Sequence, residues 1–183
     1  MVCKPDRKDE SPTFRPEIRR LLAADAGAYR DLRLEGLRLH PEAFGAAYED
    51  EARMSDADWR ERLAGSVIFG AFRQQTLVGT AGSYRPPGAK QRHKALLVGV
   101  YVSEAARGGG VARALVQAVI EQARGEVGQI LTTVNAANGS AWRLYESLGF
   151  RQWGLQPRSL KVGEGYVDEV EMVLFFDEPP AGT

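Results

Sequence analysis

Residues 98–114 read Val-Gly-Val-Tyr-Val-Ser-Glu-Ala-Ala-Arg-Gly-Gly-Gly-Val-Ala-Arg-Ala, and this stretch decides the fold. Its β-branched first part predicts a strand that ends at Val102. After a short turn, the run Arg-Gly-Gly-Gly-Val-Ala at 107–112 opens into a helix. Glycines let the backbone come close to a ligand and adopt positive φ, while the free N–H groups and dipole of a helix N-terminus attract anions. The stretch therefore predicts a phosphate-binding turn.

Two familiar phosphate loops do not fit these glycines. A P-loop requires Gly-Lys-Ser or Gly-Lys-Thr, and neither follows here. The dinucleotide pattern Gly-x-Gly-x-x-Gly/Ala fails because Arg113 stands at the third small position. What remains is Arg-x-x-Gly-x-Ala, formed by Arg107, Gly110 and Ala112. Taken alone, this motif leaves a plain flexible loop as the alternative.

A second segment, residues 134–150, carries another pattern. It reads Val-Asn-Ala-Ala-Asn-Gly-Ser-Ala-Trp-Arg-Leu-Tyr-Glu-Ser-Leu-Gly-Phe. Asn138 is a suitable N-cap, apolar residues follow at helical spacing, and Gly149 is a natural C-terminal stop. Phe150 then begins the next strand.

Together the two segments resemble the GNAT superfamily of acetyl-CoA-dependent N-acetyltransferases. The first matches the family's Gln/Arg-x-x-Gly-x-Gly/Ala pyrophosphate loop at Arg107, Gly110 and Ala112. The second matches an Asn-x-x-Ala-x-x-Leu-Tyr-x-x-x-Gly-Phe segment at Asn138, Ala141, Leu144, Tyr145, Gly149 and Phe150. The resemblance extends over residues 16–176.

The resemblance implies acetyl-CoA as cosubstrate and a site for it. In the family, pantetheine lies where the strand ahead of the loop splays from its neighbour, and its amides pair with the exposed strand backbone. Arg107 and Arg113 either add charge near the pyrophosphate or are merely solvated, and Asn138 combines a cofactor contact with its capping role. The implied cofactor-binding residues are Val100, Val102, Arg107, Gly108, Gly109, Gly110, Val111, Ala112, Arg113 and Asn138.

Acetyl transfer to an amine needs a held donor, a neutral amine, a stabilised oxyanion and a protonated leaving thiolate. By resemblance, the backbone N–H near Val102 polarises the thioester carbonyl. Tyr145 is the candidate general acid, because a phenol with a pKa of about 10 is protonated at neutral pH. The alternative for Tyr145 is a core tyrosine on an amphipathic helix. The general base stays open: the strand before the loop contains no acid, which leaves Glu35, Glu42, Asp168, Glu169 or a chain of waters.

The acceptor side carries no decisive motif. We expect Glu35, Glu42, Tyr84 and Tyr101 to line it, since carboxylates suit a cationic amine, although the two glutamates are equally ordinary as solvated helix residues. The favoured function is transfer of acetyl to the primary amine of a small molecule by direct attack in a ternary complex. The alternatives are acetylation of a protein N-terminus or lysine, and a non-catalytic acetyl-CoA-binding regulatory module.

Composition describes an ordinary soluble chain. Hydrophobic residues make up 44% of its 183 residues, and 24 Lys and Arg balance 24 Asp and Glu. Zero net charge argues against a nucleic-acid partner. No apolar run approaches the roughly 20 residues that cross a bilayer, so we expect no membrane partner. The N-terminal segment has no apolar core and is no signal peptide, so a cytoplasmic location is expected.

Cysteine and histidine give little support to metal chemistry. Cys3 is the single cysteine, which excludes an internal disulfide and a cysteine-based zinc site. His40 and His93 have no ligand partner at metal spacing, so we expect no metal. The sequence leaves the oligomeric state open, a homodimer included.

The periodicity predicts one α/β domain over residues 15–176, between charged tails at 1–14 and 177–183. Its order, β-α-α-β-β-β-α-β-α-β-β, predicts a GNAT-like fold with a mixed twisted sheet of about seven strands flanked by about four helices. Residues 41–54 are expected to be irregular or weakly helical. The expected strands cover 17–22, 67–73, 77–84, 94–102, 129–134, 150–155 and 166–176. Of the four expected helices, one starts after Asp25, one starts after Ser55, one begins at Val111 and one contains Tyr145.

Overall fold

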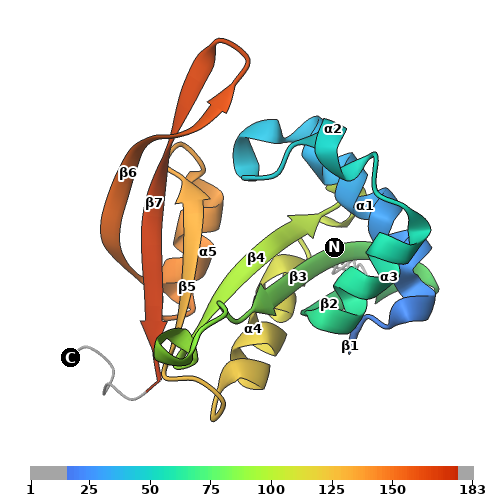
Figure 1. The fold of residues 1–183 in the computed structure, drawn as a ribbon, viewed down its shortest axis with the longest axis horizontal. Coiled ribbons are helices and arrows are strands. Elements are labelled where there is room, and N and C mark those ends of the chain that lie inside the picture. The colour runs from blue at the N-terminus through green and yellow to red at the C-terminus, as the bar shows by residue number, and fades with distance from the viewer. Residues whose placement is uncertain (1–15, 177–183) are drawn as a thin grey trace, which may run out of the picture.

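One mixed sheet runs through the molecule (Figure 1). The computed structural model describes residues 16–176, so both predicted tails, 1–14 and 177–183, lie outside the described residues. The seven strands follow the order β1-β2-β3-β4-β5-β7-β6, and only β4 and β5 pair in parallel. This confirms the predicted sheet. The strands are β1 Glu17–Arg20, β2 Val67–Arg73, β3 Thr76–Tyr84, β4 Lys94–Val102, β5 Gln129–Asn135, β6 Arg151–Val162 and β7 Gly165–Phe175.

Helices cover both faces of the sheet. The α-helices are α1 Ala26–Leu39, α2 Tyr48–Glu51, α3 Asp56–Gly65, α4 Val111–Ala123 and α5 Gly139–Ser147. Buried side chains of α4 form one core cluster with the central strands, while α1 and α3 form a second around Trp59. Between the two clusters, β3 is buried along its whole interior. Residues 41–54 hold a 3-10 turn, Pro41–Ala43, and the short α2, which confirms the weakly helical prediction.

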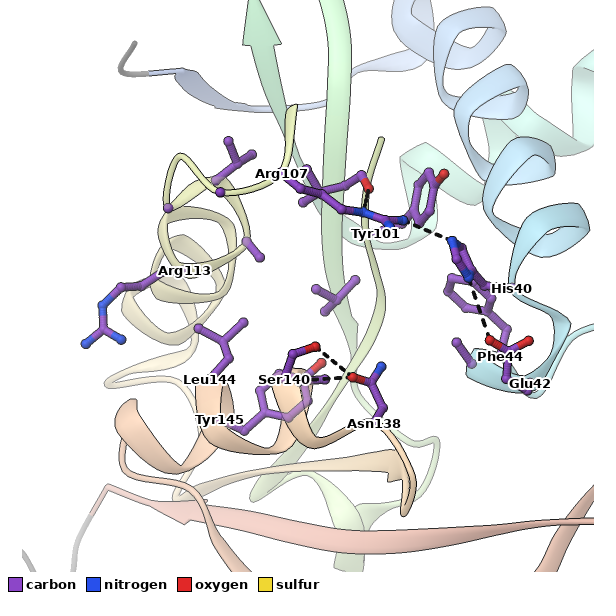
Figure 2. A pocket seen from close by; sticks show the side chains of 18 residues that line it. His40, Glu42, Phe44, Tyr101, Arg107, Arg113, Asn138, Ser140, Leu144 and Tyr145 are labelled. Carbon is purple, nitrogen blue, oxygen red and sulfur yellow. Dashed lines mark hydrogen bonds and ion pairs between the residues drawn. The ribbon is translucent and has the colours of Figure 1, made fainter. Parts of the chain in front are cut away.

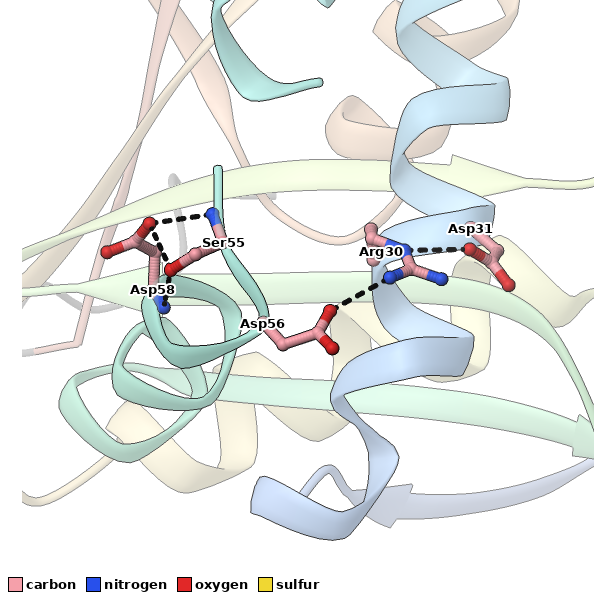
Figure 3. A network of polar contacts seen from close by, with 5 residues as sticks. All are labelled: Arg30, Asp31, Ser55, Asp56 and Asp58. Carbon is pink, nitrogen blue, oxygen red and sulfur yellow. Dashed lines mark hydrogen bonds and ion pairs between the residues drawn. The ribbon is translucent and has the colours of Figure 1, made fainter. Parts of the chain in front are cut away.

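The start of α3 shows how local sequence fixes an element (Figure 3). Ser55 Oγ accepts a hydrogen bond from the backbone N–H of Asp58, and the Asp58 carboxylate accepts one from the N–H of Ser55 at 2.8 Å. This capping box satisfies two backbone donors that a helix N-terminus otherwise leaves free. Arg30 on α1 donates to Asp56 at 2.9 Å, which ties α1 to α3.

The sheet splits between β4 and β5. Only Lys94–Leu96 pair with Gln129–Leu131, and beyond these residues the two strands diverge (Figure 1). Gly99 adopts φ 64°, where the pairing of β4 with β3 shifts register. A hydroxyl from each neighbouring strand supports the break, since Thr80 Oγ1 donates to the Gly99 carbonyl at 3.2 Å and Thr132 Oγ1 to the Leu97 carbonyl at 3.1 Å. Unpaired backbone of β4 therefore borders a cleft.

The last hairpin differs from the prediction. The strand expected over 150–155 instead runs from Arg151 to Val162, and the β6–β7 hairpin extends beyond the rest of the sheet (Figure 1). Polar residues, Pro157 and two register shifts hide the second half of β6 from a periodicity argument. Arg158 adopts φ 53° within this irregular part. Proline and bulges are tolerated here because β6 is the edge strand.

Within residues 16–176, no helix is long and apolar enough to cross a membrane. The same residues contain no group of three or more His, Cys, Asp or Glu side chains placed to hold a metal ion.

Candidate active site

A cavity of about 600 Å³ lies at the split, between the end of β4 and the N-termini of α4 and α5 (Figure 2). It brings together most of the residues predicted from sequence. Gly109, Glu35 and Tyr84 are not among its lining residues, and Tyr84 lines a different cavity beside Arg85 and Glu126. The predicted residues that line it are Glu42, Val100, Tyr101, Val102, Arg107, Gly108, Gly110, Val111, Ala112, Arg113, Asn138 and Tyr145.

The glycine turn has the geometry of an anion site. Gly110 adopts φ 73° and ψ 8° as the N-cap of α4, and Gly108 has φ 82°. A Cβ built at either position would meet no atom within 4 Å, so these glycines are needed for backbone conformation and leave open space in front of the turn. The first turn of α4 carries no acidic residue. Its N–H groups and the helix dipole therefore face a cavity suited to phosphate.

Both arginines of this region are engaged by protein groups. Arg107 Nε donates to the Val102 carbonyl at 3.1 Å, and its Nη2 lies 2.9 Å from His40 Nε2. Its side chain thus crosses the cavity from the turn to the end of α1 (Figure 2). Arg113 Nη1 donates to Ser147 Oγ at 2.7 Å and points away from the cavity (Figure 2). The contacts with His40 and Ser147 could not be predicted from the sequence alone, because these partners are distant in the chain.

Tyr145 is buried at the base of the cavity. Its side chain packs against Phe150, with ring centroids 5.6 Å apart. Burial raises the pKa of Tyr145 to about 12, while a hydrogen bond with Thr132 acts in the opposite direction. The phenol is therefore protonated throughout the neutral range and can donate a proton.

Asn138 caps α5 as expected. Its Oδ1 accepts from the N–H of Ala141 at 3.1 Å and from Ser140 Oγ at 2.9 Å. The cap places Asn138 and Ser140 at the cavity wall (Figure 2). Its capping role is confirmed, and its cofactor contact stays a prediction.

A polar cluster borders the other side of the cavity. Tyr101 donates to Glu35 Oε1 at 2.8 Å, and burial, followed by the hydrogen bond and charge of Glu35, raises the pKa of Tyr101 to about 12. Glu35 is thus held by Tyr101 rather than facing the cavity. Glu42 does line it, with Oε1 3.6 Å from His40 Nδ1. The sequence did not predict that His40 lines this cavity, because a histidine before a proline at a helix end carries no local signal.

A second cavity, of about 270 Å³, lies beside the first. The two share Ala43, Phe44, Val100 and Tyr145, so they meet at the candidate acid. The second is also lined by Arg33 of α1 and Glu169 of β7. No sequence motif marks this cavity, because its walls come from six separate segments.

A match to a family model identifies the class of protein to which this chain belongs. Residues 33–150 match the model of the acetyltransferase (GNAT) family, and the chain belongs to that family. Among solved structures, it is similar to ribosomal-protein-alanine N-acetyltransferase from Brucella melitensis, at 26% identity and a TM-score of 0.73, with 87% of this chain and 99% of that chain covered.

Two further relatives are similar. A GNAT superfamily phosphinothricin acetyltransferase from Sinorhizobium meliloti, solved with acetyl-CoA, shares the fold at 22% identity and a TM-score of 0.73, covering 87% of this chain and 88% of that chain. Mycothiol acetyltransferase from Thermobispora bispora is 35% identical over 142 residues, which are 72% of this chain and 42% of that protein. The chain therefore spans less than half the length of this curated relative.

Proposed function

We propose that this chain transfers the acetyl group of acetyl-CoA to the primary amine of a small molecule, by direct attack within a ternary complex. One observation carries the proposal: a buried tyrosine, whose pKa burial raises, stands where the cavity in front of the glycine turn meets a second cavity. Membership of the acetyltransferase family and a solved relative that holds acetyl-CoA support the choice of donor.

The donor side of the site depends on backbone groups. The turn at 107–112 would bind the pyrophosphate through N–H groups at the start of α4. Beyond Leu96, β4 has no pairing with β5, so Val100 and Val102 can offer backbone hydrogen bonds to the pantetheine amides. The cavity of about 600 Å³ is roomy enough for this extended arm.

The chemistry follows from the position of Tyr145. The amine nitrogen attacks the thioester carbonyl carbon, and a backbone N–H of β4 near Val102 stabilises the oxyanion. When the carbon–sulfur bond breaks, Tyr145 donates its proton to the sulfur. Holding both reactants in adjoining cavities makes the attack effectively intramolecular.

The test is a screen for release of free thiol from acetyl-CoA in the presence of small primary amines and of peptides with free N-termini or lysines. We expect turnover with at least one class of small amine. Turnover with peptides alone would show that the chain acetylates proteins and not small molecules. Thermal stabilisation by acetyl-CoA without turnover of any acceptor would favour a regulatory binding module.

A further inference from the structure

We propose that the second cavity is the acceptor site, and that Glu169 binds the amine there as an ammonium ion and takes its proton. The inference rests on the proposed function and adds to it the acceptor's position, charge and proton acceptor. Sequence reasoning left Glu169 as one of several acids with no means of choosing among them.

Position supports this assignment. The cavity opens where β4 and β5 separate, with Val98 and Thr133 on its strand walls. It shares Phe44, Val100 and Tyr145 with the donor cavity. An acceptor that fills it therefore reaches the place where the acid stands, without displacing anything from the phosphate turn.

The charged residues that line the second cavity support the assignment more strongly than its position does. Besides Tyr145, the ionisable residues that line the cavity are Arg33 and Glu169. Arg33 donates through Nε and Nη2 to the two carboxylate oxygens of Glu51, at 2.9 and 3.1 Å, and both side chains are largely buried. Its charge therefore has a partner inside the protein.

Glu169 differs from Arg33 in this respect. It is half-buried, it accepts a hydrogen bond from the neutral hydroxyl of Ser159, and it forms no ion pair among residues 16–176. A partly desolvated carboxylate is stabilised by a cationic ligand when the cation that lines the same cavity, here Arg33, is already paired with another carboxylate. The cavity therefore selects an ammonium group over a neutral or anionic one.

Size narrows the class of acceptor. A cavity of about 270 Å³ takes a molecule of amino-acid dimensions, smaller than typical drug-sized ligands. Phe44 and Val98 provide apolar wall for a short carbon chain or ring. The fitting acceptor is thus a small primary amine with a compact apolar body.

The proton balance is complete with groups already present. Glu169 takes one proton from the ammonium ion, which frees the lone pair that forms the carbon–nitrogen bond. The carbon–sulfur bond then breaks with its electron pair on sulfur, which takes the proton of Tyr145. The resulting phenolate takes the second proton from nitrogen, and Glu169 releases its proton to water, so one proton is released for each turnover.

The experiment measures binding of primary amines from butylamine to 2-phenylethylamine, each paired with the alcohol of the same shape, by calorimetry on protein saturated with coenzyme A. Glu169→Gln is compared with wild type, and Glu171→Gln is the control, since it lies two residues along the same strand and outside the cavity. Acetyl-CoA thermal shifts are recorded for all three proteins, and steady-state kinetics for every amine that reacts.

We expect at least one amine to bind wild type and Glu171→Gln tenfold or more tightly than its alcohol, and Glu169→Gln to lose that preference while keeping its acetyl-CoA shift. Where an amine reacts, its kcat/KM should fall by about 10²-fold in Glu169→Gln. The inference is overturned if no amine is preferred over its alcohol, or if Glu169→Gln keeps the preference. Absence of any acetyl-CoA shift in wild type would instead overturn the proposed function.

Discussion

The proposed donor and acceptor sides of the cleft are built in opposite ways. The proposed donor side comes mainly from one contiguous stretch, the end of β4 and the turn into α4, where glycines hold the backbone N–H groups. The proposed acceptor side is assembled from α1, the turn after it, β4, β5, α5 and β7. The donor side should therefore tolerate changes of side chain but not of backbone conformation, and the acceptor side should show the reverse.

The largest effect should come from Tyr145, the ionisable residue that both cavities share. Tyr145→Phe keeps the ring packed on Phe150 but removes the proton donor, so turnover should fall by roughly 10²–10⁴-fold with little change in acetyl-CoA affinity. Steady-state kinetics with free-thiol detection measure it. Tyr29→Phe is the control, because Tyr29 is another buried tyrosine, packed on Trp59 away from the cleft. Equal turnover in the Tyr145 variant and wild type would make Tyr145 a core residue.

The backbone dependence of the donor side can be broken at one glycine. Gly110→Val forces a β-branched residue into φ 73° at the N-cap of α4. The variant should therefore need about tenfold more acetyl-CoA than wild type for the same rise in melting temperature, or show no rise at all. Gly125→Val is the matched control, because Gly125 also has a positive φ, 85°, and open space around an added Cβ, but lies after the end of α4. Both variants should lose similar intrinsic stability, roughly 1–2 kcal/mol. A normal acetyl-CoA shift in Gly110→Val would contradict the phosphate assignment.

Two ion pairs of Glu51 hold α2 against α1 and α3, beside the proposed acceptor side. Glu51 bonds Arg33 and also Arg62 at 3.0 Å, so Glu51→Gln should lower the free energy of unfolding by about 3 kcal/mol at neutral pH. Burial is the largest single influence on the pKa of Glu51 and raises it. Bonds and charges from Arg33 and Arg62 together outweigh burial and hold the pKa below its ordinary value of 4.5.

The pH dependence of this pair has a definite sign. Because the folded pKa is lowered, the stabilisation is complete above 4.5 and is lost as pH falls through the folded pKa. The stability difference between wild type and Glu51→Gln should therefore be constant at neutral pH and shrink under acid, measured by denaturant unfolding. A difference that grew under acid would contradict the ion-pair account.

The smallest effect on kinetics is expected from Glu42. Glu42 lines the donor cavity, but its side chain is about half exposed and lies close to His40, so its charge is screened by water. Glu42→Gln should raise the KM of a cationic amine by a few fold and leave that of acetyl-CoA unchanged. Adding Glu35→Gln should change little more, because Glu35 is engaged by Tyr101. A change in the KM of acetyl-CoA alone would show that Glu42 acts on the donor and not on the amine.

The same contrast explains what could be predicted from sequence. Glycines with positive φ, an N-cap and helical spacing are local properties, so the turn at Gly110 and the helix of Tyr145 were found with nearly correct bounds. The contact of Arg107 with His40 and the walls around Glu169 depend on segments that become neighbours only in the folded protein. The second half of β6 was missed because an edge strand can hold proline and bulges, which weaken its alternation.

A crystal structure of the complex with coenzyme A would locate the donor directly. We expect the pyrophosphate against the N–H groups of residues 108–112, the pantetheine arm along β4 at Val100 and Val102, and the thiol at Tyr145, with the second cavity left free. A pyrophosphate bound elsewhere, a thiol far from Tyr145, or an arm that fills the cavity beside Glu169 would contradict this expectation.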